Sequence, residues 1–401
     1  MSPDTQAGPG RPAVGPGRRS ALRFVLLVGL MSLFADFTYE GMRAIVGPYL
    51  AVLGAGALAI GVITGLGELL GYGLRVASGR LSDRTRAFWP ITIVGYIVQM
   101  SAVPLLALAG SWPLAAVLIV LERVGKATRN PPRDVMLSHA AREMGGFGWA
   151  FGLHEALDQA GALLGPIAMA VVLAVSEGRY RLALATLAVP AAITLTVLAV
   201  ARVQYPRPEE METHPPDIRT QGMPRVFWIY LAGASLVAAG FADFPLIAFH
   251  FHEAATVSAD TIPIFYGVAM GVSGLGSLAF GRLFDRRGIG LLIPLTLVSA
   301  VFAPLVFLGG FWPALVGASL WGLGMGVHES IVPAAVAPMV PVDRRASAYG
   351  LFTAAYGISW FVGSVIIGAL YTVAVGAAVA FCVAAELAAI PLFIRVARTS
   401  A

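Results

Sequence analysis

The sequence predicts an all-α membrane protein in which twelve transmembrane helices form two six-helix bundles related by pseudo-two-fold symmetry. The first observation is composition: the 401 residues are 58% hydrophobic and 12% charged, with a mean hydropathy of +0.79, against roughly 25% charged residues in soluble domains. The second is that apolar runs of about 20 residues, the length that crosses a bilayer, recur between short polar breaks. The third is that short patterns of the first half return in the second half.

The predicted elements follow one another along the chain. Residues 1–20 are rich in Pro and Gly and are expected to form a disordered cytoplasmic tail. The first six-helix bundle is predicted over residues 21–203, a cytoplasmic linker over 204–224, and the second bundle over 225–401. The first helix is expected to stay in the membrane, because it is too long for a signal peptide and contains acidic residues.

Basic residues predict the orientation. Arg80, Arg84 and Arg86 follow the second helix, and further arginines fall in alternate loops, whereas the loops near 54–57 and 110–113 have none. By the positive-inside rule, both termini and the linker face the cytoplasm, which places the protein in the inner (plasma) membrane. The net charge of +5 does not indicate a nucleic-acid partner, because the arginines do not form one face.

The two halves of the chain share a repeat. "GRLSDR" at position 79 returns as "GRLFDR" at 281, an offset of 281 − 79 = 202, and "FADF" at 34 returns at 241, an offset of 241 − 34 = 207. Such an offset spans six helices, so the second half enters the membrane in the same orientation as the first. The sequence therefore predicts two parallel bundles joined by the linker.

With these motifs, the chain resembles the major facilitator superfamily of secondary transporters over nearly its whole length. The loop signature of that family, Gly-x-Leu-x-Asp-Arg, stands after the second and the eighth helix. The resemblance implies a gating latch between two rocking states, formed by Gly79, Asp83, Arg84, Gly281, Asp285 and Arg286. A fifth-helix signature of proton-driven exporters is met in part by Gly161, Gly165 and Pro166, and this favours export.

Ionisable residues stand inside the apolar segments, where a charge costs from about 3 to more than 10 kcal/mol. Asp36, Glu40 and Arg43 are four and three residues apart, so they share one helical stripe. By the resemblance, helices 1, 4, 7 and 10 line a central cavity, which lets such residues face water. The predicted proton-coupling and substrate residues are Asp36, Glu40, Arg43, Glu122, Arg123, Lys126, Arg129, His154, Glu155, Asp158, Asp243, His328 and Glu329.

Mid-membrane acids beside an arginine suit proton coupling. Burial favours the protonated carboxyl and a nearby guanidinium favours the carboxylate, so a rocking motion can switch between the two. We therefore expect Asp36, Glu40 and Asp158 to carry the proton or its competitor, with Arg123 tuning them.

Two further pairs of charged residues are expected to have different roles. Lys126 and Arg129 are expected to shape an anion-attracting cytoplasmic vestibule. Glu68 and Arg75 lie two turns apart on the second helix, and we expect them to form a structural ion pair.

The segment "FHFHE" contains the candidate metal ligands His250 and His252. Residues two apart on a helix point to different sides, so no metal site is predicted there. No Gly-x-x-x-x-Gly-Lys-Ser/Thr loop is present in the sequence, which argues against ATP-driven transport. No cofactor is expected, and the protein is not expected to be an enzyme.

The predicted function is that of a proton-coupled secondary transporter of a small organic solute, an exporter (antiporter) that works by alternating access. An organic-anion/H+ uptake symporter is the main alternative, favoured by the basic residues of the fourth helix. A divalent-metal exporter that uses Asp36, Asp243 and the histidines is a third possibility, and a membrane receptor or scaffold is a fourth. The expected partners are the small-molecule substrate, protons and the lipid bilayer, and the protein is expected to be a monomer.

Overall fold

The computed structural model describes residues 16–143, 147–206, 223–336, 339–340 and 345–400, which contain helices and no strands. The first half consists of α1 (Pro16–Val52), α2 (Ala57–Thr85), α3 (Phe88–Leu105) with the short 3-10 turn η1 (Leu106–Leu108), α4 (Trp112–Glu143), α5 (Phe147–Val175), α6 (Tyr180–Thr186) and α7 (Ala188–Gln204). The second half consists of α8 (Arg225–Gly240), α9 (Phe244–Glu253), α10 (Ile262–Arg287), η3 (Gly288–Leu291), α11 (Leu292–Ser299), α12 (Phe302–Leu308), α13 (Phe311–Ala334), α14 (Arg345–Val373) and α15 (Val375–Ser400).

These helices have the length and composition of membrane spans. Within the described residues, 10 segments are long and apolar enough to cross a membrane, some of them built from two consecutive helices such as α6 with α7 and α8 with α9. α4 and α13 are the other two long helices. α4 contains Glu122, Arg123, Lys126, Arg129 and Arg133, which lowers its hydropathy, whereas α13 contains only His328 and Glu329 of the predicted site residues. With these two helices, the count in the described residues reaches the predicted twelve.

The predicted tail and linker lie largely outside the described residues. α1 begins at Pro16, so the last residues of the predicted tail, 1–20, are helical, while residues 1–15 lie outside the described part. Most of the predicted linker, 204–224, also lies outside it, since the description stops at residue 206 and resumes at 223.

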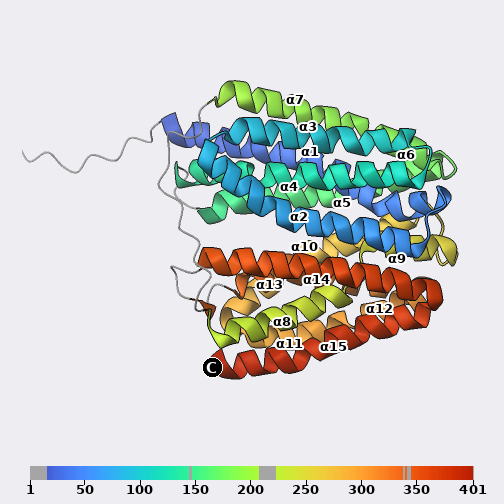
Figure 1. The fold of residues 1–401 in the computed structure, drawn as a ribbon. Coiled ribbons are helices and arrows are strands. Elements are labelled where there is room, and N and C mark those ends of the chain that lie inside the picture. The colour runs from blue at the N-terminus through green and yellow to red at the C-terminus, as the bar shows by residue number, and fades with distance from the viewer. Residues whose placement is uncertain (1–15, 144–146, 207–222, 337–338, 341–344, 401) are drawn as a thin grey trace, which may run out of the picture.

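The two halves form two bundles that lie side by side (Figure 1). Within the first half α1 packs against α5, and α3 against α4; within the second half α10 packs against α13, and α8 against α15. Between the halves, α2 packs against α14 and α5 against α10. These two seams pair the second helix of one half with the fifth of the other, as pseudo-two-fold symmetry requires.

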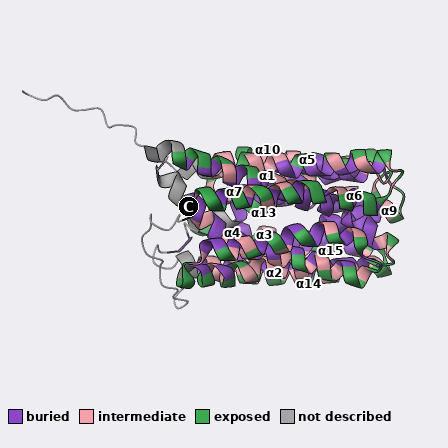
Figure 2. Ribbon diagram, turned by 90° about the horizontal axis from the view of Figure 1, so that it is seen from above, coloured by how far each residue is buried: buried purple, intermediate pink, exposed green. Residues whose placement is uncertain are grey.

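The start of α1 and the end of α15 lie at the same end of the molecule, here called the terminal end (Figure 1). At the opposite end, the far end, the halves touch through small residues. Gly47 of α1 lies against the backbone of Pro245, and Gly61 of α2 against the backbone of Ser364, with no room for a side chain. Figure 2 shows buried residues gathered at this end, near α6 and α9. The far end is therefore closed.

Close helix contacts also hold the first half together. A methyl group at Gly161 of α5 would overlap the backbone of Leu33 and Phe37 of α1, and one at Gly165 would overlap Phe37 and Gly41. Such small-residue contacts are common where helices pack inside a membrane, because they let the two backbones approach closely.

We expect Gly161→Ala to lower the stability of the folded protein by about 1–3 kcal/mol, because α1 and α5 must move apart to admit the methyl group. Thermal unfolding of the detergent-purified protein measures this. Gly73→Ala in α2 is the matched control, since nothing lies within 4 Å of its Cβ position. An unchanged melting temperature for Gly161→Ala would show that this helix contact is not tight.

Candidate functional site

A cavity of about 340 Å³ lies between the two halves. Residues of α1, α2, α4 and α5 form one wall, and residues of α10 and α13 form the other. Its ionisable lining residues are Asp36, Glu40, Arg43, Glu68, Arg75, Arg123, Lys126, Glu155, Asp158, His328 and Glu329.

The cavity opens toward the terminal end. Three of its lining residues are exposed, namely Arg75, Glu155 and Glu329. They lie in the halves of α2, α5 and α13 that are nearer to the terminal end. Because the far end is closed, the cavity is accessible from the terminal end only.

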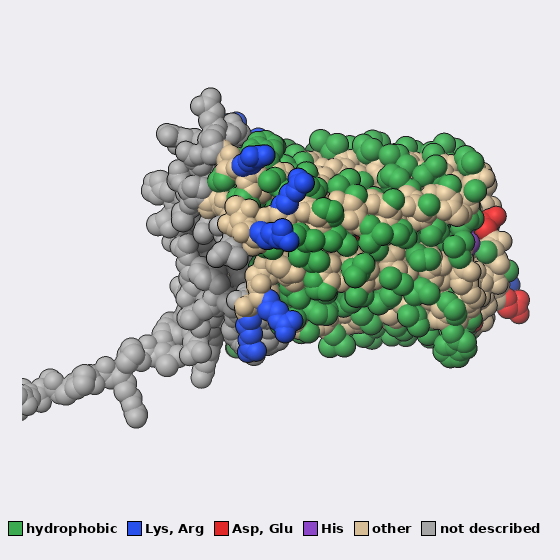
Figure 3. Space-filling view, turned by 90° about the horizontal axis from the view of Figure 1, so that it is seen from below, with side chains coloured by type: hydrophobic (Ala, Val, Ile, Leu, Met, Phe, Trp, Pro, Cys, Tyr) green, Lys and Arg blue, Asp and Glu red, His purple; other side chains and the backbone are tan. Residues whose placement is uncertain are grey.

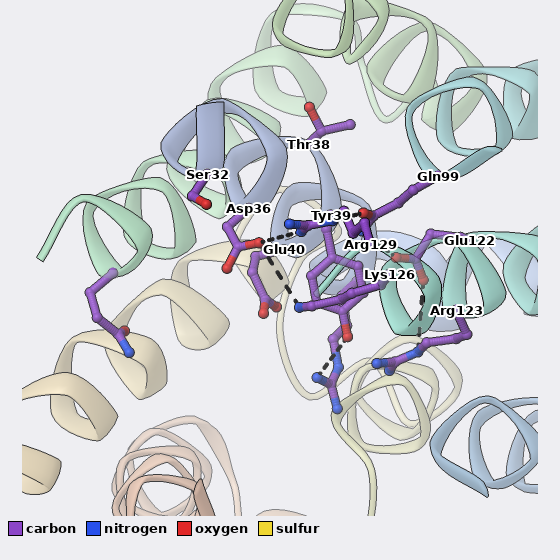
Figure 4. Close-up of polar contacts among 12 residues, drawn as sticks. Ser32, Asp36, Thr38, Tyr39, Glu40, Gln99, Glu122, Arg123, Lys126 and Arg129 are labelled. Atoms are coloured by element: carbon purple, nitrogen blue, oxygen red, sulfur yellow. Dashed lines mark hydrogen bonds and ion pairs between the residues drawn. The ribbon is translucent and has the colours of Figure 1, made fainter. Parts of the chain in front are cut away.

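The predicted stripe on α1 is present and faces the cavity (Figure 4). Tyr39 extends it, three residues after Asp36. Lys126 Nζ lies 3.7 Å from the centre of the Tyr39 ring, and Arg43 donates a hydrogen bond of 3.0 Å to the Tyr39 hydroxyl. The tyrosine therefore separates two cations that would otherwise repel each other.

Asp36 lies between two cations of α4. Its Oδ1 is 3.9 Å from Lys126 Nζ and 3.6 Å from Arg129 Nη2, and this oxygen makes no hydrogen bond in the described part of the chain. Arg129 is fully buried, and it also donates hydrogen bonds to Gln99 and to Tyr96 of α3. Gln99 in turn donates a hydrogen bond of 2.8 Å to Glu122.

Arg129 is therefore not placed where the expected cytoplasmic vestibule would need it. Arg129 does not line the cavity, because α3 and Asp36 enclose it. Lys126 does line the cavity. Glu122 is fully buried against α3 and likewise does not reach the cavity.

Glu40 and Arg43 connect α1 to the second half. The Tyr266 hydroxyl of α10 donates a short hydrogen bond to Glu40. Arg43 Nη2 lies 3.5 Å from Glu68 of α2 and 3.7 Å from Asp243. The contacts to Tyr266 and Asp243 cross the boundary between the halves, so they must break if the halves rock apart at the far end, whereas Glu68 belongs to the same half as Arg43.

Asp243 lies in a break between α8 and α9. Residues 241–243 are not helical, and α9 restarts at Phe244 with Pro245 in its first turn. Asp243 accepts hydrogen bonds from Trp360 (3.1 Å) and Ser364 (2.9 Å) of α14. It is buried and does not line the cavity, so its contacts hold α1, α9 and α14 together.

Arg123 is paired differently from the expectation. It lies 2.8 Å from Glu68, and its next acid is Glu122 at 3.7 Å, whereas the expectation placed it beside Asp36, Glu40 and Asp158. Glu68 accordingly pairs with Arg123 and Arg43, and the expected Glu68–Arg75 pair is absent from the described contacts. Glu68 thus lines the cavity and pairs with cations of α1 and α4.

The acids of α5 that line the cavity, Glu155 and Asp158, form no ion pair with any residue that the structure describes. Asp158 Oδ1 is buried and makes no hydrogen bond, and no ion pair to Asp158 is found among the described residues. Glu155 accepts a hydrogen bond of 3.0 Å from Gln159. His154 is buried and does not line the cavity, in contrast to the expectation that it shares the site with Asp158.

On the second half, α13 contributes two adjacent site residues. His328 is buried and lies 2.7 Å from the Tyr356 hydroxyl. Glu329 is exposed, lines the cavity, and has no ion pair within the described part of the protein.

The candidate metal ligands do not converge. His250 Nδ1 lies 2.8 Å from the Tyr371 hydroxyl, whereas the ring of His252 is 6.3 Å from that of Tyr180. Across the residues that the structure describes, no group of three or more His, Cys, Asp or Glu side chains is placed to hold a metal ion.

The predicted latch stays a prediction. The side chains of Asp83 and Asp285 lie outside the described residues, so their contacts are not described. Gly79 and Arg84 lie near the terminal end of α2, and Gly281 and Arg286 occupy the corresponding place in α10.

Sequence reasoning missed the neutral members of the site. Tyr39 could have been found, because it shares the stripe of Asp36 at a spacing of three residues. Gln99, Tyr96 and Tyr266 could not, since they come from other helices and carry no pattern of their own.

The sequence and the fold were compared with those of known proteins. The model of the Major Facilitator Superfamily matches residues 25–364. A protein of Mycobacterium tuberculosis described as uncharacterized is 39% identical over 398 residues, which cover 98% of this chain and 96% of that protein. An MFS-type transporter of Methanocaldococcus jannaschii, also described as uncharacterized, is 25% identical over 366 residues, or 88% of this chain and 90% of the relative.

Solved structures share the fold at low sequence identity. The nucleoside transporter NupG superposes with a TM-score of 0.73 at 13% identity, over 94% of this chain and 98% of that one. A bacterial homologue of the human lysosomal transporter Spinster, in an inward-facing conformation, superposes with a TM-score of 0.67 at 14% identity, over 98% and 97% of the two chains.

Proposed function

Because the chain belongs to the Major Facilitator Superfamily, we propose that this transporter moves a small organic solute across the inner membrane in exchange for protons. Transport takes place through the central cavity, by rocking of the two halves between a state open at the terminal end and a state open at the far end. Asp158, Glu40 and Asp36 take up and release the protons.

The excess of carboxyl groups in the cavity is the observation that supports proton coupling. Six acids line it (Asp36, Glu40, Glu68, Glu155, Asp158 and Glu329) against four cations (Arg43, Arg75, Arg123 and Lys126). The buried Arg129 behind Asp36 is a fifth cation, and one acid remains in excess. Structural ion pairs need equal numbers of the two signs. An isolated carboxylate in a poorly solvated site is costly, so surplus acids bind protons.

The distribution of charge supports a cytoplasmic terminal end. On the face shown in Figure 3, Lys and Arg side chains gather near the terminal end, and acidic side chains stand at the far end. By the positive-inside rule, the terminal end then faces the cytoplasm, and the cavity is open to the cytoplasm. An exporter in this state collects its solute from inside the cell.

Proton release on solute binding tests the proposal. The purified protein in weakly buffered detergent solution is mixed with lipophilic cations, organic anions, zwitterions and divalent metals while a pH indicator is followed. An exchanged solute is expected to release protons, because the solute and the protons compete for the same carboxyls. A compound that binds saturably at pH 5–9 without any change in bound protons would contradict the proposal.

An organic-anion/H+ symporter is a second candidate. Lys126 lines the cavity without a hydrogen bond among the described residues, which favours an anionic ligand. In the same titration a symported anion takes up protons as it binds, so the sign of the pH change separates symport from exchange.

The latch at the terminal end is expected to control the balance of the two states. Asp83→Asn and Asp285→Asn should leave the protein folded and slow its turnover. Labelling of single cysteines introduced along the cavity, in a background that lacks Cys382, measures which end is open. Unchanged turnover together with unchanged labelling in both variants would remove the latch role.

A further inference from the structure

We propose that the solute is a small zwitterion, a molecule with one ammonium and one carboxylate group; this substrate class rests on the transport function proposed above. The proposal rests on two observations: several charged side chains of the cavity have no close partner among the described residues, and the cations and the acids of this set stand on different helices.

The weakly paired cations of the cavity belong to α2 and α4. Lys126 Nζ has its nearest acid oxygen at 3.9 Å, and it makes no hydrogen bond within the described part of the chain. Arg75 lies over the ring of Tyr72 at 5.8 Å and forms no ion pair with any described residue. Both side chains line the cavity and keep N–H donors free for a carboxylate.

The unpaired acids belong to α5 and α13. Asp158 presents a buried oxygen without a hydrogen bond, and Glu155 accepts one only from the neutral Gln159. Glu329 stands across from them on the other half. None of these acids has a Lys, Arg or His nitrogen within 4 Å in the described structure, so they are free to accept from an ammonium group.

Arg75 of α2 and the acids of α5 stand on helices at opposite seams of the molecule, whereas Lys126 stands on α4, which packs mainly against α3 and α2. α2 packs against α14, whereas α5 packs against α10, and Figure 2 shows these two seams on opposite sides of the central space. The cavity therefore has a cationic side formed by α2 and α4 and an anionic side formed by α5 and α13.

A zwitterion fits this polarity better than a singly charged solute does. A cationic solute would leave Lys126 with only its long contact to Asp36, and an anionic solute would leave Asp158 without any ion pair to a described residue. Both side chains are half-buried, so a missing partner there weakens binding more than at the exposed Arg75 and Glu155. The volume of about 340 Å³ is at the low end for ligand sites, which suits a molecule of amino-acid size. Met270 and Met325 of the second half offer an adaptable apolar surface to its side chain.

Binding of charge-matched compounds to the purified protein tests this class. Glycine, leucine, phenylalanine and glutamine are compared with their amides (cations), N-acetyl derivatives (anions) and N-acetyl amides (neutral) by isothermal titration calorimetry. At least one free amino acid is expected to bind, and blocking either of its charges should weaken binding about tenfold or more. If no free amino acid binds, or if a blocked derivative binds equally well, the substrate class is wrong.

Paired variants then assign each charge to its side of the cavity. Lys126→Gln should reduce the preference for the free amino acid over its amide, whereas Lys126→Arg should retain it. Glu155→Gln should reduce the preference over the N-acetyl derivative. Arg395→Gln and Glu253→Gln, at exposed positions near the two ends of the molecule, are the matched controls. If the free amino acid, its amide, its N-acetyl derivative and its N-acetyl amide are all weakened equally in both cavity variants, the assignment is wrong.

Thermal unfolding of each variant shows whether it is folded. Because Glu155 is exposed, Glu155→Gln is expected to fold, and it tests the assignment by itself if Lys126→Gln does not fold. Proton release in the same titrations separates the two proposals. Amino-acid binding without proton release would contradict the coupling and support the substrate class. Proton release by a singly charged compound, with no amino-acid binding, would support the coupling and contradict the substrate class.

Discussion

Asp158→Asn is expected to abolish solute movement driven by a pH gradient while solute binding stays measurable. Asp158 has a buried oxygen without a hydrogen bond and no ion pair in the described structure, whereas Asp36 lies within 4 Å of both Lys126 and Arg129. A carboxylate beside two cations is stable without a proton, but one that lacks them is costly. Asp158 is therefore the acid whose charge depends most on the proton.

The asparagine amide has the shape of the protonated carboxyl but cannot release a proton. The rate of uptake into proteoliposomes is measured with and without an imposed pH gradient, and we expect the gradient-driven rate to fall at least a hundredfold, or about 2.7 kcal/mol in effective barrier. Asp158→Glu keeps the carboxyl and is the matched variant. Wild-type accumulation against a gradient by Asp158→Asn would exclude Asp158 as the coupling group.

A loss of transport in Asp36→Asn is harder to interpret, although the sequence predicts Asp36 as a proton-coupling residue. The substitution leaves the fully buried Arg129 without its acidic partner. Breaking a buried pair by removing one partner costs about 3–5 kcal/mol. A loss of transport in Asp36→Asn therefore counts for coupling only if thermal unfolding shows that the protein is still folded.

Asp243→Ala is expected to open the far end. The change removes the acceptor of two hydrogen bonds from α14 and the partner of Arg43 at 3.7 Å. Hydrogen bonds to a charged group each contribute about 1.5–3 kcal/mol, so the state that is closed at the far end should lose stability relative to the alternative state.

Hydrogen exchange measured by mass spectrometry reports the opening. Exchange should rise at least tenfold in Phe244–Glu253 (α9) and over residues 44–52 of α1, because these segments pack against each other. Asp243→Asn retains a hydrogen-bond acceptor and should have a smaller effect. Unchanged exchange in both segments for Asp243→Ala would show that the break at residues 241–243 does not hold the far end closed.

The sequence predicts much of the fold because hydropathy and helical periodicity are local properties. Long apolar runs define the helices, and the repeat predicts the parallel halves, both of which the fold confirms. The repeat does not predict equal local structure, however. "FADF" lies inside the continuous α1 in the first half but spans the break between α8 and α9 in the second.

The residue after each copy explains this difference. Thr38 follows the first copy and lets α1 continue, whereas Pro245 follows the second and starts a new helix, since proline fits the first turn but not the interior.

The ion pairs of the site could not be predicted in the same way. The spacing of Asp36, Glu40 and Arg43 predicts a shared face, and the three residues do line one cavity. Which cation each acid meets depends on the rotation and tilt of α4 relative to α1 and α2. Arg123 pairs with Glu68 and Arg129 with Asp36 for that reason, although both arginines stand on the same helix.

Proton movement driven by a solute gradient tests proton exchange most directly. Proteoliposomes that contain a pH-sensitive dye are loaded with the tightest-binding compound of the titrations above and are diluted into medium of the same pH without it. We expect the lumen to become more acidic as the solute leaves, and this change to be absent in Asp158→Asn. Efflux of the solute from wild-type vesicles without any change in luminal pH would contradict proton exchange.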